Sequence, residues 1–180
     1  MRHHINRFEE MLTAATARVA RDYFQLPVAD ADAAYRERVY CYELYHQLRC
    51  VWDDFPFSLG GEVDKVGSPH FRDGPYAQAK PDLLVHVPGE MGHNLATVEV
   101  KPCDRSVGAF REDLEKLAWF CQSAGYFRGL FLVYGTPQGG EGAVRAKVQH
   151  AVHSSARVDP QFIEAFHHGR VGSAATGLDI

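Results

Sequence analysis

Two short stretches of this sequence carry acidic and basic side chains at the ends of apolar runs. Asp82 follows a proline and precedes the apolar run 83–87, while Glu99 and Lys101 flank Val100 at the end of a second apolar run. Both runs are bounded by prolines or glycines and are rich in leucine and β-branched residues, so they are predicted to be strands. Side chains alternate between the two faces of a strand, which places Glu99 and Lys101 on the same face. If the two strands pair as a hairpin, Asp82 comes next to Glu99.

Two carboxylates and a lysine in this arrangement suit metal-assisted chemistry. Mg²⁺ prefers hard oxygen ligands and is commonly held by one or two carboxylates together with substrate phosphate. The predicted ligands are Asp82, Glu99 and the carbonyl oxygen of Val100. A bound metal acidifies a water molecule and neutralises transition-state charge, and Lys101 could orient or deprotonate that water, or stabilise the developing charge. The reaction that this set suits best is phosphodiester hydrolysis.

The pairing of Pro81-Asp82 with Glu99-Val100-Lys101, their strand setting and the helix expected after them resemble the PD-(D/E)xK superfamily of nucleases, the restriction-endonuclease-like fold. The resemblance covers about residues 31–135. It implies an α/β protein with a mixed sheet and an αβββαβ core, acting as a Mg²⁺-dependent endonuclease or exonuclease in which Mn²⁺ can substitute. It also implies nucleic acid as the partner, DNA more than RNA, in bacterial antiviral defence or DNA maintenance.

The resemblance implies supporting acids outside the two strands. In many members of the family a helix ahead of the sheet carries a glutamate that reaches the metal, and Glu43 is the matching position. Pairing of Glu43 with Gln47 or Arg36 on a solvated face remains open. The first strand of the sheet often brings a further acid, and Glu62 is favoured over Asp64 as this additional metal ligand.

Candidate substrate contacts lie on both sides of the motif. The loop 67–80 leads into Asp82, and its residues Arg72, Tyr76 and Lys80 could hold substrate. On the helix that follows the second strand, the resemblance implies that Lys116 or Gln122 faces phosphate. Lys116 also lies one turn from Glu112, a spacing that predicts an ion pair on the exposed side of that helix.

Apolar periodicity and breakers predict a single domain over 1–180, with a core at 31–135 flanked by an N-terminal helix appendage within 1–29 and C-terminal helices and a tail within 136–180. The N-terminal helix is expected to pack on the outside of the core or to form a dimer contact. The predicted core elements are a helix from Asp30 or Asp32 to about Asp54, strands at 62–66, 83–87, 96–102 and 128–135, and a helix from Ser106 to about Gly125. Beyond the core, helices are predicted at 141–154 and from Asp159 through Phe166, followed by a mobile tail from Gly169.

Composition limits the other properties. With 180 residues, 46% of them hydrophobic, the chain can bury one core. No apolar run approaches the roughly 20 residues needed to span a membrane, which predicts a cytoplasmic protein. The net charge of −4 gives no overall attraction for nucleic acid, so binding would depend on a local basic patch, a homodimer or a larger complex. The cysteines lack C-x-x-C spacing and are predicted to be reduced and buried.

Two other functions stay open at this point. A non-catalytic subunit or scaffold would keep the nuclease fold with a vestigial site and bind nucleic acid or a protein partner. A different α/β enzyme would use His70, His86 or His93 as a general base, although the sequence contains no nucleophile elbow, phosphate-binding loop or dinucleotide-binding glycine pattern. The histidine pairs at 150/153 and 167/168 lack metal-binding spacing and are predicted to be exposed or at helix ends.

Overall fold

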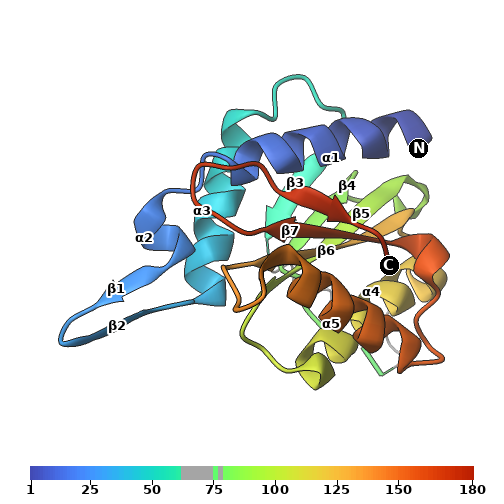
Figure 1. Cartoon of the computed structure of the whole chain (residues 1–180). Helices are drawn as coiled ribbons and strands as arrows, with labels where there is room; N and C mark the ends of the chain where they lie inside the picture. Colours follow the sequence, from blue (N-terminus) through green and yellow to red (C-terminus); the bar gives the residue numbers. More distant parts are fainter. Residues whose placement is uncertain (62–74, 77–78) are drawn as a thin grey trace.

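A six-stranded mixed sheet forms the centre of the protein (Figure 1). The computed structural model describes residues 1–61, 75–76 and 79–180. The strand order is β3-β4-β5-β6-β7-β8. The strands are β3 (Ser58–Gly61), β4 (Leu83–His86), β5 (Asn94–Pro102), β6 (Arg128–Tyr134), β7 (Ile163–His168) and β8 (Thr176–Leu178). The first three pair antiparallel, β5, β6 and β7 run parallel, and β8 is antiparallel to β7.

Helices cover both faces of this sheet (Figure 1). α1 (Arg2–Thr16) and α3 (Glu37–Cys50) share a core cluster with Val98 and Val100 of β5. α4 (Val107–Ser123) and α5 (Gly140–His153) pack with Phe131 and Val133 of β6. Because side chains alternate along a strand and β5 pairs in register with β6, Glu99 shares its face of the sheet with Phe131, on the α4 side. The protein is therefore a mixed α/β protein in which the described residues form five α-helices, the sheet and one separate hairpin.

Several predicted core elements are present. β4, β5 and β6 lie where strands were expected, and α4 begins after Ser106, whose hydroxyl accepts the Ala109 N–H at 3.2 Å. The predicted helix at 141–154 is α5. The strand predicted at 62–66 falls outside the described residues, and β3 ends at Gly61, directly before it. Among the described residues, helix, three strands, helix, strand is thus the order from α3 to β6.

The N-terminal part differs from the single helix predicted within 1–29 and from the predicted start of the next helix at Asp30 or Asp32. The first helix ends at Thr16, and a short α2 (Arg21–Phe24) follows. Residues predicted to begin the next helix instead form a projecting hairpin of β1 (Leu26–Val28) and β2 (Ala31–Ala34) (Figure 1). Asp30 lies in its turn with a φ of 58°, a conformation that Asp tolerates better than most residues. The helix α3 therefore begins at Glu37, several residues later than predicted.

The C-terminal part corrects the predicted helix from Asp159. Only the 3₁₀ turn Pro160–Phe162 is helical, and the next residues form β7, buried beside β6. A short apolar run cannot be assigned to helix or strand by periodicity alone, and here pairing with a parallel neighbour decides the outcome. The tail predicted to be mobile contributes β8 to the sheet. The C-terminal region is thus one helix and two strands, not a set of helices.

Buried histidines correct a further expectation. His167 and His168 are 5% and 0% exposed, because β7 lies inside the sheet. His168 Nδ1 lies 2.7 Å from the Tyr40 hydroxyl, and burial lowers the pKa of His168 to about 4. Both histidines therefore belong to the core, and His168 is neutral there at neutral pH.

All four cysteines are free thiols, and three are buried, but Cys50 is exposed. Across 1–61, 75–76 and 79–180, no helix combines the length and apolar character needed to cross a bilayer. The apolar stripe of α1 belongs to the main core cluster, so this helix packs on the sheet as one of its covering layers.

Candidate functional site

The register of β4 and β5 brings the two predicted acids together. Leu83 lies opposite Val98 and Leu84 opposite Thr97. One further step along this antiparallel register places Asp82 opposite Glu99. The Val100 N–H donates to Asp82 Oδ2 at 2.8 Å, which fixes the Asp82 carboxylate against the end of β5. The structure therefore places Asp82 and Glu99 side by side, as the hairpin hypothesis predicted.

Pro81 explains why the ladder stops at this point. In an antiparallel pair, the N–H and C=O of one residue point towards the same neighbouring strand. The Val100 N–H points to Asp82, so the Val100 carbonyl faces the same side. Pro81 would be opposite Val100 if the pairing continued, but proline has no N–H to donate to that carbonyl. The strand pairing therefore gives way to a side-chain hydrogen bond, and the Val100 carbonyl is directed towards the segment that precedes β4.

A cavity of about 250 Å³ lies at this end of the sheet, and every residue known to line it is charged. Four elements contribute: the start of α3, the segment before β4, the end of β5 and the middle of α4. The lining residues are Glu37, Arg38, Lys80, Asp82, Glu99, Lys101 and Lys116. Acids and bases from distant parts of the sequence thus meet in a single polar cavity.

Two lysines connect the acids through ion pairs. Lys101 Nζ lies 2.9 Å from Glu37 Oε2 and 2.9 Å from Asp113 Oδ2. Lys116 Nζ lies 2.6 Å from Glu99 Oε2 and 3.5 Å from Asp113 Oδ1. Asp113 therefore bridges both lysines from α4. Removing one member of such a buried network leaves an uncompensated charge, so each residue constrains the positions of the others.

Burial alters the proton affinity of the acids. It raises the pKa of Asp82 to about 6, although the hydrogen bond from Val100 acts in the opposite direction. Burial, together with the nearby Asp82 charge, raises the pKa of Glu99 well above its usual range. Among the described residues, the buried Glu99 Oε1 has no hydrogen-bond partner. Burial thus removes part of the solvation that Asp82 and Glu99 would need if both were ionised.

Lys101 responds in the opposite way. Burial alone would lower the pKa of Lys101, but the charge of Asp113 and hydrogen bonds to Asp113 and Glu37 outweigh it and raise the pKa. A lysine held in this way stays protonated at neutral pH. Of the roles predicted for Lys101, orienting water and stabilising negative charge fit this environment, whereas deprotonating water does not.

The donor set can be compared with the needs of Mg²⁺. Over the part of the chain that the structure describes, no group of three His, Cys, Asp or Glu side chains could hold a metal ion. The available set is Asp82, Glu99 and the carbonyl of Val100, while the predicted additional ligand Glu62 lies outside the described residues. One or two carboxylates with retained waters are a common Mg²⁺ arrangement, and the unpartnered Glu99 oxygen gives that ion a place to bind. The residues present therefore fit Mg²⁺ bound mainly by two carboxylates.

The acid that α3 contributes to the cavity is a different residue from the one predicted. Glu43 Oε1 accepts a hydrogen bond from Gln47 at 2.8 Å, the solvated-face alternative, and Glu43 does not line the described cavity wall. Glu37, in the first turn of the same helix, reaches the cluster instead. Sequence reasoning missed Glu37 because it placed the start of the helix too early, which put Glu37 inside the helix, away from its terminus.

Asp113 is the second residue that the sequence analysis missed. It is 7% exposed and lies on the apolar stripe of α4, at a helical spacing from Phe110 and Leu117. An acid in an apolar stripe is a signal in its own right, because a buried carboxylate requires a cationic or hydrogen-bonding partner. That signal could have identified Asp113 before the structure was known.

The predicted substrate contacts are distributed unevenly. Lys116 faces the cavity and pairs with Glu99 and Asp113, so the ion pair predicted with Glu112 is wrong. Lys80 also lines the cavity. Gln122 is exposed on α4, and the Tyr76 hydroxyl donates to Glu115 at 3.2 Å. Arg72 and Asp64 lie outside the described residues.

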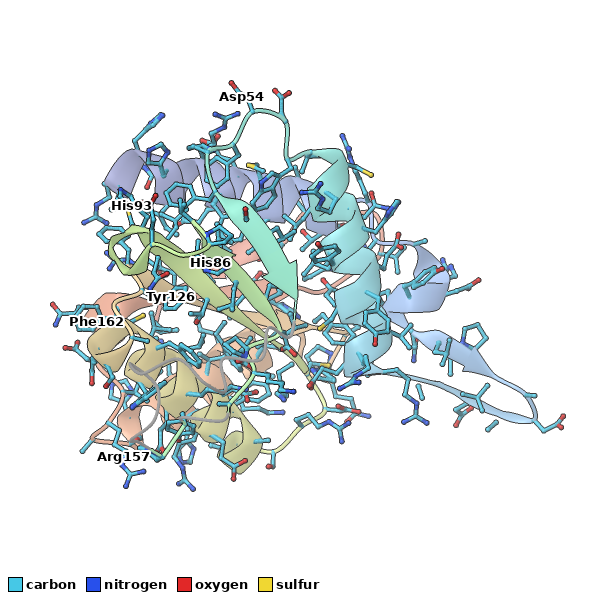
Figure 2. The ribbon with its side chains drawn as sticks, turned by 180° about the vertical axis from the view of Figure 1, so that it is seen from behind. Asp54, His86, His93, Tyr126, Arg157 and Phe162 are labelled. Atoms are coloured by element: carbon cyan, nitrogen blue, oxygen red, sulfur yellow. The ribbon has the colours of Figure 1, made fainter. Side chains whose placement is uncertain are left out.

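Two of the three histidines proposed as general bases, His86 and His93, lie at the other end of β4. His86 is the last residue of that strand, and Figure 2 shows it near His93, in the turn that leads to β5. His93 pairs with Glu90 at 2.8 Å. Neither lines the charged cavity as described, and His70 is outside the described residues. The structure therefore keeps the described histidines apart from the acids.

No protein-family model and no curated protein matches this chain. The site described above consequently has to support any function through its own geometry and chemistry.

Proposed function

We propose that this protein is a Mg²⁺-dependent nuclease that hydrolyses phosphodiester bonds of nucleic acid, with DNA the favoured substrate. The observation that carries the proposal is the pair Asp82 and Glu99, held side by side in a charged cavity with one buried carboxylate oxygen unpartnered among the described residues. The order of elements from α3 to β6 supports a restriction-endonuclease-like core, because it is the αβββαβ order of that fold.

Asp82, Glu99 and the Val100 carbonyl would hold the ion, with Mn²⁺ able to replace Mg²⁺. When bound, the ion would supply an acidified water and compensate charge on the phosphate. The same ion would add to the partial compensation by Lys116 and satisfy the two carboxylates, whose burial raises the pKa of each. This reasoning gives a physical role to an acidic pair that the fold alone does not require.

The lysines would contribute hydrogen-bond donors and positive charge to the site. Glu37 and Asp113 hold Lys101 as a protonated donor beside Glu99, so it can orient a water or donate to a phosphate oxygen. Lys116 is held by Glu99 and Asp113 in the same cavity. Arg38 and Lys80 line the cavity too, which gives it the positive charge needed to accept a phosphate despite the net charge of −4.

The test is cleavage of plasmid, single-stranded DNA and RNA in Mg²⁺ or Mn²⁺. Asp82→Asn, Glu99→Gln and Lys101→Met should each lower the rate by about 100-fold or more, since each removes charge stabilisation of the transition state. Glu43→Gln is the matched control on α3 and should keep wild-type activity. Failure of the wild-type protein to cut any of these substrates, or an undiminished rate in Glu99→Gln, would refute the nuclease.

One observation favours a second candidate, a non-catalytic subunit or scaffold that binds nucleic acid or a protein partner. Lys116 lies 2.6 Å from Glu99, so the cavity neutralises part of its acidic charge without a metal. Calorimetric titration with Mg²⁺ and Mn²⁺ separates the two candidates. Binding that disappears in Glu99→Gln supports the nuclease, whereas absence of binding at millimolar metal supports the scaffold. Sedimentation of the same samples tests for a homodimer.

A further inference from the structure

A second cavity, of about 420 Å³, adjoins the charged one. The residues known to line it are Cys41, Tyr42, Tyr45, Gly61, Asp82 and Leu83. Asp82 lines both cavities, so the second one begins where the proposed metal site ends. The wall of the second cavity is more apolar than that of the first, because it includes two tyrosines, a leucine and a cysteine.

One helix contributes to both cavities. Glu37 and Arg38, in the first turn of α3, line the charged cavity, while Tyr42 and Tyr45 line the second. Arg38, Tyr42 and Tyr45 are four and three residues apart, so they share one face of the helix. They extend over about 10 Å along its axis at the usual helical rise. A ligand bound along this face of α3 would contact the charged Arg38 at one end and the aromatic rings of Tyr42 and Tyr45 at the other.

The two tyrosine rings are held differently. The Tyr45 hydroxyl donates to the Leu59 carbonyl at 3.4 Å, and the ring packs partly against the core. A side chain at Gly61 would lie 3.7 Å from the Tyr45 ring, so glycine at this position places no side chain of its own against that part of the ring. Tyr42 is 61% exposed, which is unusual for a large aromatic side chain. The cavity thus offers one fixed and one open aromatic ring.

We propose that this second cavity binds the base of an unpaired nucleotide whose phosphate lies at Asp82 and Glu99, so that the substrate is single-stranded nucleic acid or an unpaired end. The proposal rests on the nuclease function proposed above and names its substrate class. Aromatic rings bind unpaired bases by stacking, whereas a base inside a duplex has both faces covered by its neighbours. A chain with a net charge of −4 is also poorly suited to gripping many duplex phosphates.

The test measures binding without metal, so that it does not depend on cleavage. The probe is a short single-stranded DNA containing 2-aminopurine, whose fluorescence falls on stacking, compared with the matched duplex in EDTA. Tyr42→Ala should weaken single-strand binding by about 10-fold or more, the usual effect of removing a stacking ring. Tyr42→Phe should keep the affinity because it keeps the ring. Tyr23→Ala is the control, since Tyr23 is 43% exposed on α2 and lines neither described cavity wall.

Two binding results would overturn the base-binding proposal, and a cleavage result given below would do the same. One is equal single-strand affinity in Tyr42→Ala and wild type, and the other is tighter binding of the duplex than of the single strand by the wild-type protein. The failure of the nuclease itself is recognised separately, by absence of cleavage in Mg²⁺ and Mn²⁺. Cleavage of duplex and single strand at equal rates, unaffected by Tyr42→Ala, would leave the nuclease standing and remove the base-binding cavity alone.

Discussion

Asp82→Asn is expected to stabilise the metal-free protein while it abolishes cleavage. Burial raises the pKa of Asp82 from 3.8 to about 6 in the folded protein. A native-state pKa above the unfolded-state value means that the folded protein binds the proton more tightly, so ionisation opposes folding. At about 1.36 kcal/mol for each pKa unit, the ionised Asp82 carboxylate costs about 3 kcal/mol of folding free energy at neutral pH.

The sign of the pH dependence follows from the same shift. The folding free energy lost to ionisation of Asp82 is absent below about pH 4, where the carboxyl is protonated in both the folded and the unfolded state. This loss grows as the pH rises to about 6. Asparagine has no ionisation, and its amide oxygen can still accept the Val100 N–H. The variant should therefore exceed the wild-type free energy of unfolding by up to about 3 kcal/mol at pH 7.5 and converge with it near pH 4.

Urea unfolding in EDTA, followed by circular dichroism between pH 4 and pH 7.5, measures this difference. Asp32→Asn is the matched control, because Asp32 is exposed in the β1–β2 hairpin and should leave the pH profile unchanged. Added Mg²⁺ should then stabilise the wild type and not Asp82→Asn, since a ligand stabilises only the state that binds it. Parallel pH profiles for wild type and Asp82→Asn, or lower stability of the variant at pH 7.5, would refute the reasoning.

Three further predictions concern the fold. Burial lowers the pKa of His168 from 6.5 to about 4, so protonation opposes folding. As the pH falls from 6.5 to 4, the free energy of unfolding of the wild type, measured in urea, should therefore fall by about 3 kcal/mol more than that of His168→Gln. Gly129→Ala should lower the free energy of unfolding, measured by thermal unfolding, by about 1–3 kcal/mol, because the new Cβ would lie 2.9 Å from the Leu117 side chain. The control Gly142→Ala, in α5, should not destabilise the protein, because its Cβ meets nothing within 4 Å. Ser106→Ala removes the N-cap of α4 and should cost about 1 kcal/mol by the same measurement, and an unchanged melting temperature would contradict the capping role.

The sequence alone predicted the approach of Asp82 and Glu99. Both acids lie at the ends of apolar runs with a short connection, and the two-residue period of a strand determines which side chains share a face. The local signals for α4, α5 and β6 were equally direct, because a cap residue, a helical period or a buried apolar run lies within each segment. Caps, periodicity and apolar runs depend on residues close together in the sequence, so they can be recognised without knowledge of the fold.

Tertiary structure decided the rest of the site. Glu37 and Asp113 meet at Lys101 only because α3 and α4 pack beside the end of β5, and no spacing in the sequence encodes that meeting. The same packing keeps Lys101 protonated, since a pKa depends on burial and on the charges around the group. Likewise, Ile163–His168 is a strand because β6 offers it a parallel partner. Periodicity and caps act between residues close in sequence, whereas charge clusters and strand partners depend on elements that only the folded chain brings together.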